Sequence, residues 1–241
     1  MISSEALDAW REDFLAEFGI EREALDESVA YDRRDSERTM RARLPEGVAQ
    51  PGGPGTEERI PVRYADALPA SPEIRAWMAV LAKRAVASRR VVVSVTTGPS
   101  LLLLGITGTG KTHEAYGMVR GLAALGIRSR WRVTTAADLY ARLRPRHGVD
   151  SEAVFDDYVG ASLLVVDDLG AVKGSEWIEE VNFRLVNTRY ERMLPTLFTS
   201  NLLPKDLANA LGERVSSRLA EMTDRVTLKG TDRRYRKRDA A

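Results

Sequence analysis

A phosphate-binding motif lies near the middle of this chain of 241 residues. Residues 101–112 read LLLLGITGTGKT, a short apolar run followed by G-x-x-x-x-G-K-T. Glycine permits backbone angles that a Cβ would forbid, so successive amide N–H groups can surround phosphate oxygens. Lys111 is expected to reach the β- and γ-phosphates, and the Thr112 hydroxyl to bind Mg²⁺. The predicted nucleotide-binding residues are Gly105, Thr107, Gly108, Thr109, Gly110, Lys111, Thr112 and His113.

Two adjacent carboxylates follow a second apolar run. Residues 163–166 read LLVV, the pattern of a buried parallel strand, and Asp167 and Asp168 come directly after it. We expect Asp167 to hold Mg²⁺ together with Thr112 and Asp168 to position or activate the attacking water. The alternative for Asp168 is that it merely caps the next turn. A strand that ends in two carboxylates therefore indicates hydrolysis as well as binding.

Two further polar groups complete the candidate site. Asn201 ends a predicted strand over residues 196–200 and is expected to reach between the γ-phosphate and the water, ahead of Thr199 and Ser200. Its alternative is an ordinary turn residue. Arg214 and Arg218 are four apart on one predicted helix face. An arginine there can enter a neighbouring subunit's site and stabilise transition-state charge, or belong to a surface helix.

The elements that must position these residues alternate between strands and helices. This alternation predicts an α/β domain with a mainly parallel sheet of five strands flanked by helices. The strands are expected near residues 101–104, 128–134, 163–166, 196–200 and 226–228. The strand over 196–200 can lie between the strand that precedes the glycine-rich loop and the strand that ends in Asp167.

The N-terminal segment is acidic and amphipathic. Its first helix is expected to be capped by Ser4 and to end at Gly19, with one apolar face. The apolar residues are Leu7, Trp10, Phe14, Leu15 and Phe18. This face must pack either within the molecule or on another protein. Residues 45–59 are rich in Gly and Pro and indicate a flexible linker, which favours the docking alternative.

Composition restricts the class of protein. Apolar residues make up 44% and charged residues 29% of the chain, cysteine is absent, and no apolar stretch approaches membrane-spanning length. A cytoplasmic location is therefore expected. Net charge is only +1, yet residues 120–146 contain seven arginines and the single acid Asp138. This uneven distribution suggests a nucleic-acid partner.

The missing motifs favour ATP as the nucleotide. The base-reading Asn-Lys-x-Asp of GTPases is not found, and neither is the Leu-Ser-Gly-Gly signature of transporter-type ATPases. A binding module without turnover is a further alternative, but binding alone requires neither the Asp167–Asp168 pair nor the Arg218 helix.

Taken in order, these four elements resemble the AAA+ ATPases of the DnaC-type helicase-loader group, which are relatives of the DnaA initiators and the IstB transposition helpers. The resemblance extends over roughly residues 70–235. It implies that Asn201 is the sensor-1 residue, that Arg218 is an arginine finger acting in trans within an oligomer, and that Arg234, preferred over Arg233, contacts the γ-phosphate in cis. Only 13 residues follow Leu228, so little or no C-terminal helical lid is expected.

The resemblance also implies a function. Members of the group assemble as ATP-bound oligomers and deliver the replicative DNA helicase onto single-stranded DNA in replication initiation. The corresponding division of this chain is a helical partner-docking segment (1–44), the linker (45–59) and an AAA+ domain with a basic tail (60–241). The helicase would bind residues 1–44, and single-stranded DNA the arginine-rich region 128–146, with Trp131 and Tyr140 as stacking surfaces. An IstB-like helper that binds duplex DNA and recruits a transposase is the alternative.

Overall fold

The computed structural model describes residues 2–25, 60–87, 95–127, 130–230 and 232. They fall into two compact units. One contains residues up to 96 together with 116–130, and the other contains 97–115 together with the residues from 131 onward. The predicted linker 45–59 lies outside the described residues, so the predicted domain boundary stays a prediction.

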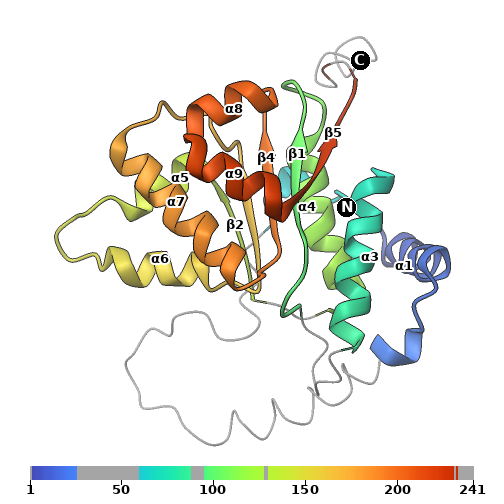
Figure 1. The fold of residues 1–241 in the computed structure, drawn as a ribbon. Helices are drawn as coiled ribbons and strands as arrows, with labels where there is room; N and C mark the ends of the chain where they lie inside the picture. Colours follow the sequence, from blue (N-terminus) through green and yellow to red (C-terminus); the bar gives the residue numbers. More distant parts are fainter. Residues whose placement is uncertain (1, 26–59, 88–94, 128–129, 231, 233–241) are drawn as a thin grey trace, which may run out of the picture. The chain divides into compact units, whose positions relative to one another are not determined.

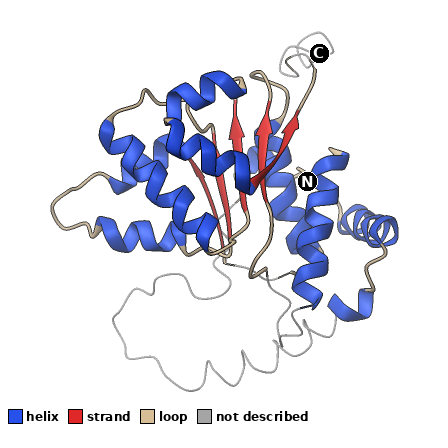
Figure 2. Cartoon of the chain, in the orientation of Figure 1, coloured by secondary structure: helices blue, strands red, loops and turns tan. Residues whose placement is uncertain are grey.

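The larger unit is built on a parallel sheet of five strands in the order β2-β3-β4-β1-β5 (Figures 1 and 2). The strands are β1 (Ser100–Leu104), β2 (Trp131–Thr135), β3 (Leu163–Asp167), β4 (Thr196–Ser200) and β5 (Thr223–Thr227). Every pairing between neighbours is parallel. The predicted fold class is confirmed, and β4 lies between β3 and β1 as expected.

The predicted bounds of two strands were wrong. β2 begins at Trp131 rather than at residue 128, and β5 begins at Thr223, three residues before the predicted start at 226. β5 is an edge strand that exposes Asp224 and Arg225, so its amino-terminal half lacks the apolar run by which a buried strand is recognised.

The three inner strands form the core. Every residue of β1, β3 and β4 is buried, which is the pattern of a parallel sheet that is covered on both faces. Alternate strand residues, among them Leu104, Val166 and Phe198, join one hydrophobic cluster with residues of five helices. These helices are α5 (Ala136–Leu143), α6 (Ser151–Val159), α7 (Glu176–Glu191), α8 (Pro204–Leu211) and α9 (Glu213–Met222).

Side-chain caps start three of these helices. Thr135 accepts a hydrogen bond from the backbone N–H of Asp138 at the start of α5, and Asp150 and Ser175 cap α6 and α7 in the same way. α8 begins with Pro204 at its first position, where the missing N–H has no intrahelical partner to lose. The caps fix where each strand-to-helix connection turns.

A buried arginine holds the amino end of the sheet together. Arg189 of α7 is fully buried and donates to the carbonyl oxygens of Val159 (2.9 Å), Ala161 (2.8 Å) and Pro195 (2.8 Å), and to the Thr196 hydroxyl (2.6 Å). Burial lowers the pKa of Arg189 to about 9, so the guanidinium is charged at neutral pH. The carbonyl oxygens replace the water that this charge has lost.

The smaller unit contains α1 (Ser4–Phe18), the short helix η1 (Val62–Tyr64), α3 (Pro72–Ala87) and the last part of α4 (Lys111–Ala124). Phe14 and Leu15 of α1 are buried, and Arg75 of α3 lies over the rings of Trp10 and Phe14 while pairing with Asp13 and Glu17. The apolar face of α1 is therefore used inside this unit.

Two details of α1 test the predicted bounds. The capping residue is Ser3 rather than Ser4, since the Ser3 hydroxyl accepts the hydrogen bond from the Ala6 N–H. Gly19 ends the helix as predicted, in the left-handed conformation at φ 60°. Within the described part of the chain, no helix has the length and apolar character needed to cross a membrane.

Candidate active site

The predicted phosphate-binding and acidic residues meet at one edge of the sheet. Parallel strands place their carboxyl ends at the same edge, and β3, β4 and β1 are consecutive neighbours. The glycine-rich loop 105–110 follows β1, Asp167 ends β3 with Asp168 after it, and Asn201 follows β4. Strand order alone therefore brings three separate parts of the sequence together.

The loop after β1 has the conformation that its glycines permit. Gly108 has φ 85°, in the region that side chains rarely adopt, and a Cβ on Gly105 would lie 2.8 Å from the Leu228 carbonyl oxygen. Thr109 is buried and closes the loop by donating its hydroxyl to the Ile106 carbonyl at 2.9 Å. Thr107 and His113 are exposed, the first in the loop and the second on the first turn of α4.

Lys111 is buried at the base of the loop, with 5% of its surface exposed. Its ammonium group donates to the carbonyl oxygens of Gly105 (2.8 Å) and Ile106 (3.0 Å) and to Asn201 Oδ1 (2.6 Å). Three acceptors fix the charge where the loop amides converge, beside the amino end of α4. A fixed cation and a helix N-terminus together favour a phosphate group.

Asp167 is held by two hydroxyl groups. Thr112 Oγ1 donates to Asp167 Oδ2 at 2.9 Å, and the Thr199 hydroxyl donates to Oδ1 through a short hydrogen bond. Burial raises the pKa of Asp167, and the hydrogen bonds from Thr199 and Thr112 oppose this effect. The nearby Asp168 charge raises the pKa further, and the Lys111 charge lowers it.

Asp168 has an unusual backbone conformation. Its φ of 56° lies in the left-handed region, which is uncommon for a residue other than glycine and costs free energy. Two hydrogen bonds hold it there: its N–H donates to Thr199 Oγ1 at 3.0 Å, and its Oδ1 accepts from Asn201 Nδ2 at 2.7 Å. Strained backbone of this kind is concentrated at functional sites. The Asp168 side chain is thus bonded to Asn201, and its role in positioning the water stays a prediction.

The oxygen donors of this site fit a magnesium ion. Thr112 Oγ1 and Asp167 Oδ2 are adjacent hard oxygen atoms, and Mg²⁺ typically takes one or two such protein ligands and completes its shell with water and phosphate oxygens. Among the described residues no group of three or more His, Cys, Asp or Glu side chains forms a self-sufficient metal cage. The residues present thus suit a metal that arrives with a nucleotide.

The structure does not bring Arg218 into this cluster. α9 ends at Met222, and β5 then starts at Thr223 opposite Ser100, the first residue of β1. The Arg218 guanidinium lies 4.5 Å from the ring centroid of Tyr190, near the end of α7, and it pairs with Glu221 at 3.5 Å. Arg218 therefore lies towards the amino edge of the sheet, away from the loop edge, and its role in a neighbouring subunit's site stays a prediction.

The chain after β5 runs towards the glycine-rich loop. The Leu228 N–H donates to the Leu104 carbonyl oxygen at 2.8 Å, and the Asp232 carboxylate occupies the space that a Cβ on Gly108 would need. Arg234 falls outside the described residues, so its role as a γ-phosphate contact stays a prediction.

The described arginines of the arginine-rich region are half-buried or exposed. Arg132 is bound to Asp157 by a two-point ion pair with distances of 2.7 and 2.9 Å. Tyr140 is buried and donates its hydroxyl to Asn182, so the prediction that it offers an exposed stacking surface was wrong. Burial, opposed by this hydrogen bond, raises the pKa of Tyr140.

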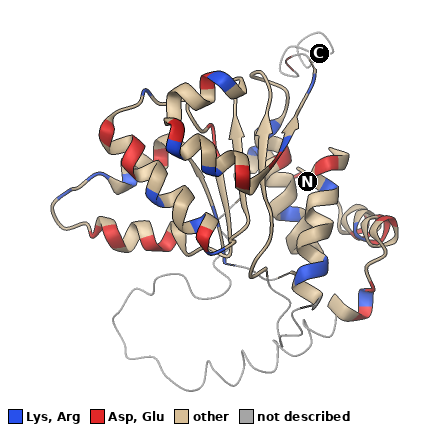
Figure 3. Cartoon of the chain, in the orientation of Figure 1, with Lys and Arg blue, Asp and Glu red and all other residues tan. Residues whose placement is uncertain are grey.

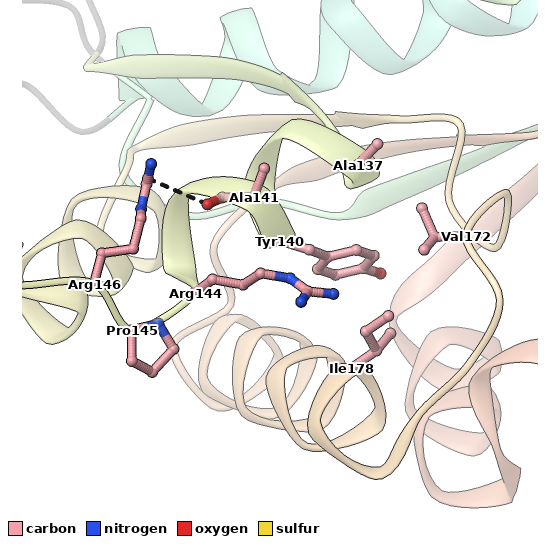
Figure 4. A pocket seen from close by; sticks show the side chains of 8 residues that line it. All are labelled: Ala137, Tyr140, Ala141, Arg144, Pro145, Arg146, Val172 and Ile178. Carbon is pink, nitrogen blue, oxygen red and sulfur yellow. Dashed lines mark hydrogen bonds between the residues drawn. The ribbon is translucent and has the colours of Figure 1, made fainter.

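Two exposed arginines, Arg144 and Arg146, are among the residues that line a pocket of about 480 Å³ beside α5 (Figure 4). Its floor is apolar and includes Tyr140, Val172 and Ile178. Arg144 lies over the Trp177 ring, and Arg146 donates to the Ala141 carbonyl oxygen at 3.3 Å. The combination of an apolar floor and a cationic rim suits an anionic ligand with a planar or apolar part.

Sequence reasoning underestimated Thr199. It ranked behind Asn201 as a group that could reach the γ-phosphate, whereas the structure binds it to Asp167 and to the backbone of Asp168. Register contained the signal: Val166 is opposite Phe198, so Asp167 and Thr199 are the next pair along two buried neighbouring strands. A buried hydroxyl beside a buried carboxylate must find a partner.

A five-stranded parallel sheet with a glycine-rich loop, a lysine, a strand-end acid pair and an intervening asparagine defines a P-loop ATPase of the AAA+ class. Residues 76–241 match the model of a protein family described as IstB-like ATP binding protein. The chain belongs to this family and is an ATP-binding ATPase.

Known proteins and structures agree with this assignment. The chain is 33% identical over 125 residues to the chromosomal replication initiator protein DnaA of Microcystis aeruginosa; the match covers 50% of this chain and only 27% of that protein. The crystal structure of the DnaC helicase loader is 26% identical with a TM-score of 0.54, covering 70% of this chain and 99% of that one. The DnaI structure, at 22% identity and a TM-score of 0.56 over 70% and 95%, shows the same fold.

Proposed function

We propose that this ATPase loads the replicative DNA helicase onto single-stranded DNA and works as an ATP-switched oligomer in replication initiation. The observation that supports this function most directly is the similarity to the DnaC helicase loader, because it extends over 99% of that chain at 26% identity. The site supports an ATP switch, since it contains groups for binding the phosphates and separate groups for hydrolysis.

In the proposed reaction, Lys111 and the loop amides would hold the β- and γ-phosphates, and Thr112 and Asp167 would hold Mg²⁺, which would neutralise charge at the phosphates. Asp168 orients a water and takes its proton as the oxygen attacks the γ-phosphorus and the bond to the bridging oxygen of ADP breaks. Asn201 connects Asp168 to Lys111 and so places the water relative to the phosphate.

Arg218 is proposed to act on the nucleotide of a neighbouring copy. Its place towards the amino edge of the sheet separates it from the loop of its own chain. Its ion pair with Glu221 also agrees with the surface-helix alternative. A mixture of Lys111→Ala and Arg218→Ala subunits distinguishes action in a neighbour's site from a place on a surface helix.

For single-stranded DNA, we propose a site formed by the exposed Arg144 and Arg146, which line the pocket beside α5, together with the exposed Arg142 in the last turn of α5. Phosphate contacts of this kind bind without reading sequence. Replacing Arg144 and Arg146 by alanine should weaken binding of a labelled oligonucleotide in fluorescence anisotropy and reduce its salt dependence. The exposed Arg192, which caps the end of α7, provides the control: Arg192→Ala should bind as the wild type does.

The helicase is proposed to bind the acidic face of residues 1–25, because the apolar face of α1 is occupied within its own unit. Glu5 and Asp8 are exposed on α1, whose acidic residues are red in Figure 3, whereas Glu12 pairs with Arg22 and Asp13 with Arg75. Such a face suits a basic surface on the partner.

Light-scattering mass of a mixture with the replicative helicase of the same cell, in the presence of an ATP analogue, tests this proposal. The double variant Glu5→Gln/Asp8→Asn should weaken the complex, and Glu179→Gln/Glu180→Gln on α7 should not. Glu5 and Glu179 both lie in the first turn of their helices. The two double variants therefore lose a similar favourable interaction between a negative charge and a helix N-terminus. If no nucleotide state gives a complex, the loader proposal fails, and binding to duplex DNA with a transposase becomes the function to test.

A further inference from the structure

Thr199 joins the two acidic residues of the site through a single hydroxyl group. Its oxygen donates to Asp167 Oδ1 and accepts the N–H of Asp168 at 3.0 Å. The residue is completely buried in β4, the strand between β3 and β1. A hydroxyl has one hydrogen to donate, so the bond to Asp167 leaves its oxygen lone pairs for the Asp168 N–H.

The bond to Asp167 determines which carboxylate oxygen is available. Oδ1 is engaged by Thr199, and Oδ2 therefore faces Thr112 Oγ1 at 2.9 Å. Without the Thr199 hydroxyl, Oδ1 would be a buried acceptor that lacks this donor, and rotation of the carboxylate would become less restricted. The distance between the two oxygens assigned to Mg²⁺ would then no longer be fixed.

The bond to Asp168 stabilises its strained backbone. The left-handed conformation at φ 56° turns this side chain towards Asn201 Nδ2, which lies 2.7 Å from Oδ1. The Thr199 oxygen is the acceptor for the N–H of this residue. Losing the acceptor removes one of the hydrogen bonds that hold the conformation.

We propose that Thr199 is a positioning residue for ATP hydrolysis, whose hydroxyl holds Asp167 in its metal-binding orientation and Asp168 in its water-binding orientation. This inference rests on the proposed roles of Asp167 and Asp168. Thr199 itself acts through these two residues and makes no contact with the reacting atoms.

The variants Thr199→Ser and Thr199→Ala form the matched pair for a test, because both lose the methyl group and only the second loses the hydroxyl. Thr199→Ala should lower kcat by about 10- to 100-fold, the usual effect of losing a group that orients a metal ligand, while KM for ATP changes by less than about threefold. Thr199→Ser should keep kcat within about threefold of the wild type.

A second readout does not depend on turnover. Binding of a fluorescent ATP analogue is titrated with Mg²⁺, and the Mg²⁺ concentration at half-maximal effect should rise by about 10-fold or more in Thr199→Ala but not in Thr199→Ser. Ser200→Ala is the control for stability. It removes the neighbouring buried hydroxyl, which donates to the Leu169 carbonyl oxygen, and its thermal unfolding shows how much the loss of a buried hydroxyl in β4 lowers stability.

The outcomes separate this inference from the assignment of the site. If Thr199→Ala and Thr199→Ser are equal in kcat and in the Mg²⁺ titration, Thr199 has no positioning role. If Thr199→Ala fails to fold, Thr199→Val takes its place, since it fills the same space without a hydroxyl. Asp168→Asn is measured alongside: normal turnover there overturns the acid-pair assignment itself, whereas slow turnover with a normal Thr199→Ala overturns only the inference about Thr199.

Discussion

Asn201 accepts a hydrogen bond of 2.6 Å from the Lys111 ammonium group through Oδ1 and donates one of 2.7 Å to Asp168 through Nδ2. The two ends of one amide thus connect the phosphate-binding cation with the proposed water-binding carboxylate. Because donor and acceptor are at opposite ends of the group, no residue of another type reproduces both bonds in the same space. This connection makes the site a single unit rather than two separate halves.

Asn201→Ala should therefore slow hydrolysis more than it weakens binding. Lys111 keeps its bonds to the two loop carbonyls, whereas Asp168 loses the partner of its side chain. We expect kcat to fall by about 100-fold, within the range for a misplaced general base, with a much smaller change in the dissociation constant for ATP. Asn187→Ala, at an asparagine on α7 that bonds to Glu191, is the control. A loss confined to ATP affinity would contradict the connecting role.

Asp168→Asn should bind ATP and hydrolyse it slowly. The substitution keeps the size of the side chain and one oxygen that can accept from Asn201, but it replaces the basic oxygen that takes the proton by an amide NH2 group. A decrease in kcat of about 100- to 10,000-fold is expected from steady-state phosphate release. Unchanged turnover would exclude Asp168 from water activation.

Asp167→Asn should retain or raise the stability of the nucleotide-free protein. Burial raises the pKa of this carboxyl group above its ordinary value, so the folded state binds the proton more tightly than the unfolded state. The free energy of unfolding therefore decreases as pH rises from the ordinary pKa of an aspartate through the raised pKa of Asp167. At neutral pH the ionised carboxylate opposes folding. A neutral amide removes that penalty.

The matching measurement is thermal unfolding at pH 7 together with ATP hydrolysis. We expect a midpoint at or above that of the wild type and a loss of Mg²⁺-dependent turnover. A clearly lower midpoint would show that the hydrogen bonds from Thr112 and Thr199 contribute more to stability than burial of the charge subtracts.

Lys111→Ala and Arg218→Ala should each be inactive for different reasons. The first should lose ATP binding, because the buried cation among the loop carbonyls is removed. The second should bind ATP yet hydrolyse it poorly, because the missing charge belongs to a neighbour's site. Lys205→Ala on the exposed first turn of α8 serves as a control for loss of a lysine charge.

Mixing these two variants tests whether Arg218 acts in trans. In a mixed oligomer, a subunit with an intact Lys111 can receive the intact Arg218 of its neighbour, so partial ATPase activity should return. Activity that stays at the sum of the separate variants would assign Arg218 to the surface ion pair with Glu221.

Much of the site could be predicted because its strands are short, apolar and parallel. Lys111 could be predicted from the glycine-rich motif, and Asp167 and Asn201 from their places at the ends of buried runs, where parallel strands share one edge. The edge strand β5 was misplaced because half of it is exposed and polar. The place of Thr199 depends on register between β3 and β4, which composition does not encode.

The N-terminal helix illustrates a different limit. Its periodicity established which residues share a face but not what covers that face. The structure covers it within its own unit, where Arg75 combines ion pairs to Asp13 and Glu17 with contacts to two aromatic rings. The exposed Glu5 and Asp8 are the part of α1 that we propose the partner binds.

The proposed loading activity is tested most directly by counting helicase molecules on a circular single-stranded DNA, which a closed ring cannot enter by threading over an end. The helicase of the same cell is incubated with the circle, ATP and either the wild-type protein or Lys111→Ala, and DNA-bound helicase is measured after gel filtration. The account predicts a several-fold increase with the wild type and none with Lys111→Ala. Equal amounts of bound helicase with the wild type, with Lys111→Ala and with no added protein would contradict it.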